Sequence, residues 1–349
     1  MTATIASSKS QEREQARAFV RDRATRLDRG ETDTREDVAR LGALGLLDLG
    51  FGDDPLTDMV AVIEDVSAES LGAGFGLWAH RMCLEYVDRG PASVRDAFRD
   101  RLASGTTIGV TAMAAGLRQA AGLGDVPLIA TAVDGGIEIS GPIRWASNVF
   151  EDAVIVLPAR GEDGSTCVAV IDASSSGVRI NPAPDLLALG ATSSTSLVLD
   201  RVFVPHERLV SADLLAFCRG IRPTFLALQT SFCSGIAGAS LAESAPLLTG
   251  LGAQFAGEHA TLAAEYESLR TRLYDFASRI DAAAVRDLIQ LRLDGSHVAV
   301  AATRLEAMLR GGAGYATTHP TNRRFREAAF LPIQSPSEGQ LRWELAQSR

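Results

Sequence analysis

Asp134 to Asn148 of the chain read DGGIEISGPIRWASN. The opening Asp-Gly-Gly is a hairpin signal, because glycine adopts the positive φ angles that tight turns between strands require. Isoleucines then alternate with polar residues from Gly136 to Ser140, which is the pattern of a strand with one buried face. Beyond this strand the segment ends in Trp-Ala-Ser-Asn. We therefore expect a β-hairpin that leads into a tryptophan and two polar side chains.

The surrounding region, from Gly105 to Val210, contains further strand patterns of the same kind. Its β-branched runs are short and are separated by turn signals, and they span residues 107–111, 128–133, 136–140, 153–158, 167–171, 177–182 and 195–203. No helical pattern lies between them. Strands at this spacing predict an antiparallel sandwich or barrel.

Both flanks of this β-region have helical periodicity instead. From Gln11 to about Ser104, apolar residues recur at spacings of three and four, and the largely apolar stretch Leu71–Tyr86 predicts a helix buried between others. After Pro205 the same periodicity covers residues 212–217, 224–248, 251–279, 282–309 and 338–347. The expected fold class is α+β, with an N-terminal helical domain (1–104), a central antiparallel β-domain (105–210) and a C-terminal helical bundle (211–349).

The composition of the 349-residue chain argues against several classes of function. A net charge of -9 and a pI near 5.2 disfavour binding to nucleic acid or to anionic membranes, since both need concentrated positive charge. Cys83, Cys167, Cys218 and Cys233 are widely spaced and have no histidine cluster nearby, so no metal site is expected. Met1–Gln15 lacks the apolar core of a signal peptide, and no apolar run reaches the roughly 18 residues of a membrane helix. We therefore expect a cytoplasmic protein.

Three segments, in order along the chain, resemble the acyl-CoA dehydrogenase superfamily. Residues 134–148 are similar to a family segment in which a β-hairpin leads into Trp-x-Thr/Ser-Asn. Residues 189–205, LGATSSTSLVLDRVFVP, are similar to the closing strands of the family's β-domain. Residues 310–327, RGGAGYATTHPTNRRFRE, are similar to its Gly-Gly-x-Gly-Tyr turn and Arg-Asp helix, with Glu327 in place of the aspartate. The resemblance implies a flavin where the three parts of the fold meet.

The resemblance also implies roles for two residues of the first segment. Trp145 would lie against the flavin ring, and the Ser147 hydroxyl would hydrogen-bond the ring near N5. Both residue types suit flavin chemistry, because an apolar face excludes water and a positioned donor stabilises the reduced ring. A strand-end tryptophan that packs into the core is the alternative interpretation of Trp145.

The motifs for the other end of the cofactor are incomplete. The family's Thr-Glu-Pro-x-Ala-Gly-Ser-Asp corresponds to residues 111–118, TAMAAGLR, which keep Thr111 and Gly116 as cofactor-binding candidates but lose the serine. The Arg-x-x-Phe-Gly motif is not visible, and Met308 stands at the position of the adenine-side glutamine. FAD is the cofactor that the resemblance implies, while FMN and no flavin at all stay open.

The glycine turn is the third group of cofactor-binding candidates. It keeps Gly311, Gly312 and Gly314, and glycines at such a turn let backbone amides approach a negatively charged cofactor group. A plain turn between two helices has the same composition. The turn therefore contributes to the resemblance only together with the other two segments.

The catalytic base of the dehydrogenases has no clear counterpart. The resemblance places Ser335 where the common subgroup has its glutamate, and a serine cannot remove an α-proton unaided. The alternative glutamate of other members, on the first bundle helix, corresponds to Phe225. Glu338 lies three residues beyond Ser335 and is the remaining carboxylate candidate, although it also suits a solvated helix start.

Three functions remain open from this pattern. The first is a flavin-dependent oxidoreductase that acts on an acyl thioester, carried by CoA or a carrier protein, or on another small organic molecule. The second is a two-component flavin monooxygenase that uses oxygen and reduced flavin from a separate reductase, and needs no carboxylate base. The third is a non-catalytic or cofactor-free relative that binds a true enzyme. The resemblance implies a homodimer or homotetramer in each case.

Two histidines bear on the monooxygenase hypothesis. His80, within LWAHRMCLEY, stands where monooxygenases of this fold often carry a helix histidine that faces the flavin. Histidine can exchange a proton near neutral pH, so His80 is a catalytic candidate. The alternative interpretation of His80 is a packing residue on an apolar helix. His319 lies just past the glycine turn, and its alternative interpretation is a surface turn residue.

Overall fold

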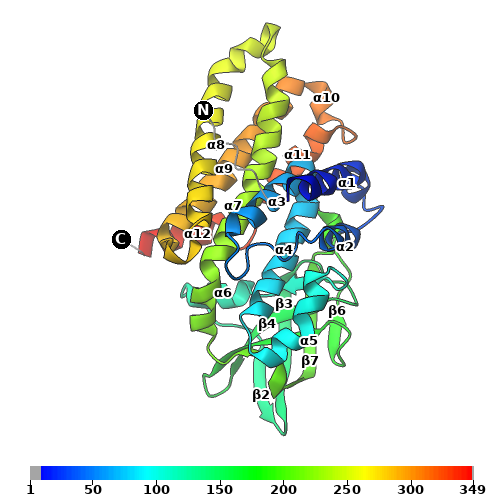
Figure 1. Cartoon of the computed structure of the whole chain (residues 1–349), viewed down its shortest axis with the longest axis vertical. Coiled ribbons are helices and arrows are strands. Elements are labelled where there is room, and N and C mark those ends of the chain that lie inside the picture. The colour runs from blue at the N-terminus through cyan, green and yellow to red at the C-terminus, as the bar shows by residue number, and fades with distance from the viewer. Residues whose placement is uncertain (1–8, 348–349) are drawn as a thin grey trace.

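The computed structural model describes residues 9–347, in which helices flank an eight-stranded sheet (Figure 1). The first eight residues of the polar stretch Met1–Gln15 lie outside this range. The N-terminal helices are α1 (Ser10–Asp28), α2 (Arg35–Ala43), α3 (Leu56–Glu69), α4 (Leu71–Asp88) and α5 (Ala92–Ala103). Every residue of α4 from Leu71 to Val87 is buried, which confirms the expected buried helix. Figure 1 shows α4 reaching from the other N-terminal helices to the sheet.

The sheet confirms the expected hairpin and adds two pairings that the sequence did not predict. Its strands are β1 (Gly109–Thr111), β2 (Ile129–Val133), β3 (Gly136–Ala146), β4 (Val154–Gly161), β5 (Thr166–Asp172), β6 (Val178–Ile180), β7 (Thr195–Pro205) and β8 (Leu209–Ser211). The order is β6-β7-β3-β2-β4-β5-β8, with β1 beside β4. Most neighbours are antiparallel, as expected, but β1 and β2 each pair with β4 in parallel. A short helix, α6 (Ala114–Ala120), connects β1 to β2, where no helix was expected.

The C-terminal helices form the bundle that the sequence predicts. They are α7 (Leu214–Ser244), α8 (Ala256–Ala277), α9 (Val285–Arg310), α10 (Gly312–Tyr315), α11 (Pro320–Ala328) and α12 (Glu338–Gln347), with 3-10 turns at Ala245–Leu247, Gly250–Phe255 and Ile280–Ala282. Two further 3-10 turns, Gly190–Thr192 and His206–Arg208, flank β7. The expected break before Thr224 does not occur, because α7 continues through Pro223. Burial on both sides of the proline stabilises the helix despite the lost backbone hydrogen bond. Together with the sheet, these helices confirm the α+β fold class.

Within the described residues, one helical stretch, Leu214–Leu247, is long and apolar enough to cross a membrane by length and composition. Its most apolar window is 83% buried inside the chain. The apolar surface of this stretch therefore contacts other parts of the same chain, as is typical of a core helix.

Candidate functional site

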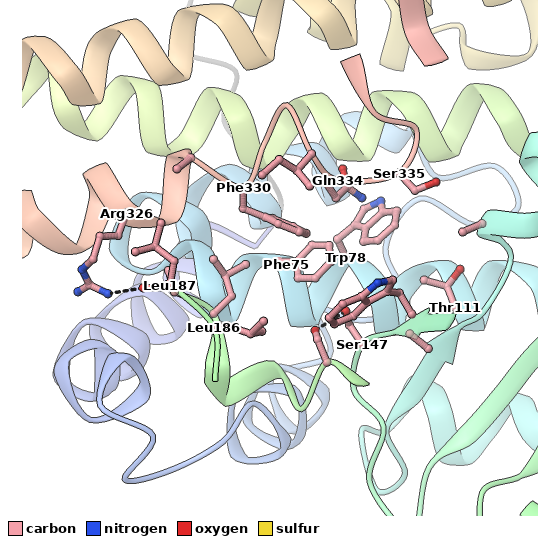
Figure 2. Close-up of a pocket in the computed structure, with 18 of the residues that line it drawn as sticks. Phe75, Trp78, Thr111, Ser147, Leu186, Leu187, Arg326, Phe330, Gln334 and Ser335 are labelled. Atoms are coloured by element: carbon pink, nitrogen blue, oxygen red, sulfur yellow. Dashed lines mark hydrogen bonds between the residues drawn. The ribbon is translucent and has the colours of Figure 1, made fainter. Parts of the chain in front are cut away.

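A cavity of about 470 Å³ lies where α4, the sheet and the C-terminal helices meet (Figure 2). All three parts of the chain contribute to it, through α4, β1, β3, α7, α11 and the adjoining loops. Its lining is mostly apolar and consists of Phe75, Trp78, Thr111, Ala114, Trp145, Ala146, Ser147, Leu186, Leu187, Ala188, Leu189, Ser194, Phe225, Arg326, Ala329, Phe330, Ile333, Gln334 and Ser335. Four of the expected site residues, Thr111, Trp145, Ser147 and Ser335, thus line one cavity.

Aromatic side chains from α4, α7 and the loop after α11 form one wall of this cavity. The rings of Phe75 and Trp78 are stacked with their centroids 5.5 Å apart. Phe330 meets Phe75 edge to face at 5.0 Å, and Phe225 meets Trp78 edge to face at 5.0 Å. Such edge-to-face pairs are favoured geometries for aromatic rings. The position of the family's alternative glutamate is therefore part of an apolar wall.

Trp145 lines the cavity from the sheet, near the end of β3. It is 59% exposed, so the alternative of a core tryptophan is wrong. The reason is a register shift in the pairing of β3 with β7 between Ile143 and Ala146, which places Arg144 and Trp145 both outside the core. Such bulges re-aim side chains next to functional sites. The indole is therefore available to a ligand.

Ser147 lies next to a short series of hydroxyl groups on the loop before β7. Its Oγ is 2.7 Å from Ser194 Oγ, and Ser194 Oγ is 2.7 Å from Thr192 Oγ1. Thr192 Oγ1 in turn donates to the Leu189 carbonyl at 2.7 Å. Ser147 and Ser194 both line the cavity, so this series connects its edge to the backbone of the loop.

Asn148, the last residue of the Trp-Ala-Ser-Asn motif, fixes the end of β3, a role that the sequence did not predict. It has a positive φ of 63°, a conformation that asparagine tolerates better than most residues. Its side-chain amide donates to the carbonyls of Gly76 at 2.8 Å and Gly109 at 3.2 Å, and its oxygen accepts from the Thr34 hydroxyl at 3.1 Å. It thereby holds β3, α4 and β1 together beside Ser147.

Ser335 and Arg326 are the informative polar residues on the bundle side. The Ser335 carbonyl accepts a hydrogen bond from Gln229 Nε2 at 2.9 Å, which anchors the loop after α11 to α7. Arg326 is paired with Asp28 at 2.6 Å and donates to the Leu187 carbonyl at 3.1 Å. Among residues 9–347, none that lines this cavity is an aspartate or glutamate. The cavity therefore offers no carboxylate base.

A second cavity, of about 530 Å³, adjoins the first and shares Ala114, Trp145, Ile333 and Ser335 with it. Its lining is more polar and includes two arginines and one aspartate, Arg118, Arg144 and Asp125, beside Ser337 and Gln340. Arg118 donates to the Leu123 carbonyl at 3.2 Å. Within the described part of the chain, no hydrogen bond or ion pair engages the Arg144 guanidinium.

His80 does not reach either cavity, and the structure does not support a catalytic role for it. The side chain is fully buried, and its Nδ1 accepts from the Gly109 amide at 2.9 Å. Nε2 must then carry the proton, which it donates to the Leu102 carbonyl at 3.0 Å. A Cβ at position 109 would come within 2.6 Å of Cys83 Cβ, so the glycine lets β1 dock closely on α4. The packing alternative for His80 is thus the one that the geometry favours.

Burial lowers the pKa of His80 and raises the pKa of Asp37, and the two shifts have opposite effects on how stability depends on pH. Burial lowers the pKa of His80 to about 4, because it disfavours the charged imidazolium. Burial raises the pKa of Asp37 to about 6, although the Arg23 guanidinium opposes this shift. Between pH 4 and 6, His80 is therefore protonated in the unfolded chain and neutral in the folded protein. Over the same range, Asp37 is protonated in the folded protein and ionised in the unfolded chain. Rising pH strengthens folding through His80 and weakens it through Asp37.

Replacing His80 with glutamine is expected to uncover the Asp37 effect. Relative to the wild type, the free energy of unfolding of His80→Gln should fall by up to about 1.4 kcal/mol per pH unit between pH 4 and 6. Asp37→Asn should show the opposite slope relative to the wild type. Urea unfolding at several pH values measures both, and parallel curves for the wild type and His80→Gln would contradict the assignment.

The remaining candidates lie outside both cavities. Gly116 is buried at a close contact, where a Cβ would meet Leu214 Cδ1 at 3.0 Å. Glu338 begins α12 and forms ion pairs with Arg342 at 2.6 Å and His297 at 3.2 Å; the Arg342 hydrogen bond lowers its pKa. The structure therefore supports the solvated helix-start interpretation of Glu338 and a packing role for Gly116.

The glycine turn forms the short helix α10 away from the cavities. A Cβ added at Gly311 or Gly312 would meet no protein atom within 4 Å, so both face open space. Gly314 is buried and packs closely on α9. His319 caps α11 by accepting from the Thr321 amide at 3.2 Å, as suits its turn alternative. Within this chain, the turn does not join the other cofactor-binding candidates.

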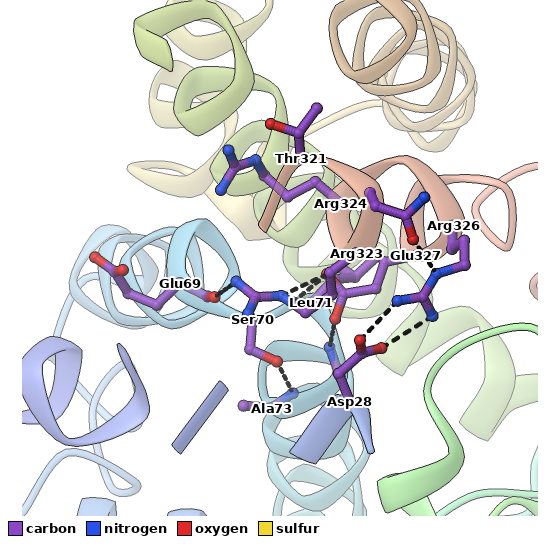
Figure 3. Close-up of polar contacts among 12 residues, drawn as sticks. Asp28, Glu69, Ser70, Leu71, Ala73, Thr321, Arg323, Arg324, Arg326 and Glu327 are labelled. Atoms are coloured by element: carbon purple, nitrogen blue, oxygen red, sulfur yellow. Dashed lines mark hydrogen bonds and ion pairs between the residues drawn. The ribbon is translucent and has the colours of Figure 1, made fainter. Parts of the chain in front are cut away.

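The beginning of α4 is held by α11, as Figure 3 shows. Glu327 accepts hydrogen bonds from the backbone amides of Leu71 at 3.3 Å and Gly72 at 3.2 Å. Arg323 donates to the Glu69 carbonyl at 2.6 Å, which fixes the end of α3. Burial raises the pKa of the Glu327 carboxyl, and the Arg323 charge opposes that shift. These contacts position the helix that carries Phe75 and Trp78. The sequence signal for the contacts was Glu327, which stands in place of the aspartate of the family's Arg-Asp helix.

No cluster of three or more histidine, cysteine, aspartate or glutamate side chains in residues 9–347 is arranged to hold a metal ion. All four cysteines are free, and Cys83, Cys218 and Cys233 are buried. The chemistry of the site thus depends on its apolar walls, its hydroxyl groups and whatever ligand the cavities accept.

No family model matches the sequence, and no curated protein sequence matches it. Solved structures do. Butyryl-CoA dehydrogenase from Megasphaera elsdenii is 17% identical, with a TM-score of 0.89 over 100% of this chain and 99% of that chain. PigA with FAD and proline is 17% identical, with a TM-score of 0.88 over 100% and 99%. FkbI, described for biosynthesis of a methoxymalonyl extender unit, is 21% identical, with a TM-score of 0.82 over 97% and 98%. The chain therefore has the fold of the acyl-CoA dehydrogenases.

Proposed function

We propose that the chain is a flavin-dependent oxidoreductase whose substrate is an acyl thioester or another small, largely apolar organic molecule. The observation that carries this proposal is the 470 Å³ cavity whose lining includes the Trp145 indole, the aromatic side chains of α4 and α7, and the Ser147 hydroxyl. Its volume lies within the range of small-molecule sites. Similar folds include a protein determined with FAD and a butyryl-CoA dehydrogenase. The residues present therefore fit the ring of a flavin.

The roles of the chain's own residues follow from their chemistry. A bound flavin would supply the redox chemistry, which no side chain of the cavity can supply. Phe75, Trp78 and Phe225 would exclude water from the reacting atoms, and Trp145 would support the face of the ring. Thr111 and Ser147 would orient the ring by hydrogen bonds at its edge. Thr111 Oγ1 is already 3.0 Å from the Tyr86 hydroxyl, which limits how it can rotate.

Flavin binding tests this proposal. Riboflavin, which carries the ring and no phosphate, is expected to bind and to quench tryptophan fluorescence. Trp145→Ala should weaken its binding about tenfold, since stacking on an aromatic face contributes about 1.4 kcal/mol. Trp343→Ala is the matched control, because Trp343 is also exposed (45%) but lines neither cavity. A protein that stays colourless with riboflavin, FMN and FAD would instead favour a cofactor-free binding partner.

The second cavity supports a phosphorylated flavin, FMN or FAD, over riboflavin. Arg118 and Arg144 line it together with Asp125, but no ion pair joins either arginine to a carboxylate within residues 9–347, and guanidinium groups suit phosphate. FMN is expected to bind about tenfold more tightly than riboflavin, and Arg144→Ala should remove most of this difference. The control is Arg179→Ala, an exposed arginine on β6 outside both cavities. Equal loss of FMN affinity in both variants would point to general charge rather than a phosphate contact.

A two-component flavin monooxygenase is the second candidate, and the lack of a carboxylate in the cavity favours it. Insertion of oxygen needs no α-proton removal, so such an enzyme tolerates Ser335 and Phe225 at the two base positions. Product formation that depends on oxygen and on a separate flavin reductase would support this candidate. Anaerobic bleaching of the bound flavin by an acyl-CoA would support dehydrogenation instead.

The location and assembly of the protein belong to the same proposal. We expect a homodimer or homotetramer in the cytoplasm, since the family that the chain resembles pairs its bundle helices between subunits. Leu251 (91% exposed) and Tyr315 (86% exposed) lie outside the cavities and are candidate interface residues. The open face of Gly311 and Gly312 would then be available to a cofactor held across an interface. Light scattering of the purified protein measures the assembly directly.

A further inference from the structure

We infer that a relay of hydroxyl groups fixes Ser147 as a hydrogen-bond acceptor, so that the cavity selects a ligand that presents an N–H or O–H at this point. Resting on the proposed function, this means that the site binds reduced flavin more tightly than oxidised flavin. The inference starts from three hydrogen bonds of 2.7 Å that connect Ser147, Ser194, Thr192 and the Leu189 carbonyl.

The direction of the relay follows from counting hydrogens. A carbonyl oxygen can only accept, so the single hydroxyl hydrogen of Thr192 is donated to Leu189. Thr192 must then accept from Ser194, whose own hydrogen is used in this bond. Ser194 has no hydrogen left for Ser147, so Ser147 donates to Ser194. The lone pairs of Ser147 are what remains for a ligand in the cavity, so Ser147 is an acceptor and not the donor that was expected from the sequence.

The loop that carries the relay is held firmly enough to keep this direction. Thr192 is fully buried, and its carbonyl accepts a hydrogen bond from the backbone amide of Asn148 at 2.7 Å. The Ser193 hydroxyl donates to the Val149 carbonyl at 3.0 Å. Leu189 and Ser193 both have positive φ angles, 63° and 46°, which are unfavourable for these residue types and persist only where surrounding contacts impose them. The Thr192 backbone amide also donates to the Leu189 carbonyl, at 3.0 Å, but reversing the relay would leave two oxygens, Thr192 Oγ1 and the Leu189 carbonyl oxygen, 2.7 Å apart with no hydrogen between them.

The consequence for a flavin is a preference between its two redox forms. In the oxidised flavin, the central-ring nitrogen N5 has a lone pair and no hydrogen. Two-electron reduction adds a hydrogen to N5. An acceptor-only hydroxyl makes a hydrogen bond with the N–H of the reduced ring and opposes a lone pair in the oxidised ring. The relay therefore stabilises the bound reduced form, which also suits an enzyme that receives reduced flavin from a reductase.

The test compares the affinities of oxidised and anaerobically reduced riboflavin in the wild type and in relay variants. We expect the wild type to bind the reduced form about tenfold more tightly, which corresponds to a midpoint potential about 30 mV above that of free riboflavin. Ser194→Ala frees the Ser147 hydrogen to rotate toward the ligand, so the preference should fall to near one and the potential to near that of free riboflavin. Ser194→Thr keeps the hydroxyl and should restore the wild-type ratio.

Two further variants separate the relay from a general effect on the fold. Ser147→Ala should lower the preference as Ser194→Ala does, and adding Ser194→Ala to it should change nothing more. Ser196→Ala removes a hydroxyl of β7 that accepts from Asn181 Nδ2 at 2.8 Å outside the cavity, and should leave the ratio unchanged. Equal affinity for both redox forms in the wild type, or an unchanged ratio in Ser194→Ala, overturns the relay inference alone. Failure of both forms to bind overturns the proposed function as well.

Discussion

Replacing Ser335 with glutamate is expected to let the protein remove an α-proton from an acyl thioester at least about 100-fold faster than the wild type, because a positioned general base contributes about 10²–10⁴ in rate. Ser335 lines the main cavity, and its backbone is anchored by Gln229 Nε2 at 2.9 Å. Gln229 is itself held by the buried Arg292, whose Nε lies 3.2 Å from its oxygen. A carboxylate introduced here would therefore project from a fixed loop.

The surroundings of position 335 suit a base that works near neutral pH. The aromatic rings of Phe75, Trp78 and Phe225 line the cavity, and an apolar environment raises the pKa of a carboxyl group. The wild-type cavity has no carboxylate of its own among residues 9–347 that would perform the same task. The gain in rate should thus come from the new group alone.

Exchange of α-deuterium from an acyl-CoA into water, followed by mass spectrometry on the flavin-loaded protein, measures this gain. Ser335→Gln has the same size without the base and should stay at the wild-type rate. Ser337→Glu places a carboxylate two residues away, in the lining of the second cavity only, and should also show no gain. Wild-type exchange at the rate of Ser335→Glu would reveal a base elsewhere, whereas no gain in a variant that still binds the acyl-CoA would favour the monooxygenase candidate.

Local sequence patterns were sufficient to predict most elements. The expected strand at 195–203 corresponds to β7, Thr195–Pro205, and the expected helix at 338–347 is α12. Both depend on periodicities of apolar residues within a few turns or a few strand residues. The parallel pairing of β1 and β2 with β4 depends on contacts between segments far apart in the chain, which local patterns do not specify. The sequence therefore predicted the elements better than their partners.

The site divides in the same way. Trp145 and Ser147 could be proposed because their motif lies in one short segment, and both line the cavity. His80 was an equally plausible site residue from its residue type and its position on an apolar helix. The side of α4 that it occupies, however, packs against Gly109 and Leu102. Which face of a fully buried helix meets a cavity is decided by its neighbours in three dimensions. Sequence periodicity gives no signal for this when every face is apolar.

Glu327→Ala is expected to lower the free energy of unfolding by about 3–5 kcal/mol, as is typical when one partner of a buried charged group is removed. The Glu327 carboxylate accepts from the amides of Leu71 and Gly72, and both amides belong to the first turn of α4. The substitution leaves these two buried donors unpaired, and it leaves Arg323 beside an empty position. The helix macrodipole adds to the loss, because a negative group at a helix N-terminus is stabilising.

The same substitution should also weaken ligand binding, although Glu327 lines neither cavity. Phe75 and Trp78 lie on the second and third turns of α4, so a loosened N-terminus moves the aromatic wall. Glu327→Gln keeps one acceptor for the amides and should lose less stability than alanine, about 1–3 kcal/mol. Urea unfolding gives the stability of each variant, and riboflavin titration gives the affinity of the cavity.

Glu243→Ala is the matched control for this prediction. Glu243 also pairs with an arginine, Arg310, at 2.6 Å, but its side chain is 51% exposed, and exposed ion pairs contribute about 0–1 kcal/mol. A loss in Glu327→Ala no larger than that in Glu243→Ala would show that the α11 contacts do not hold α4. A large loss of stability with unchanged riboflavin affinity would show instead that the aromatic wall keeps its place without them, and would separate the stability of α4 from the shape of the cavity.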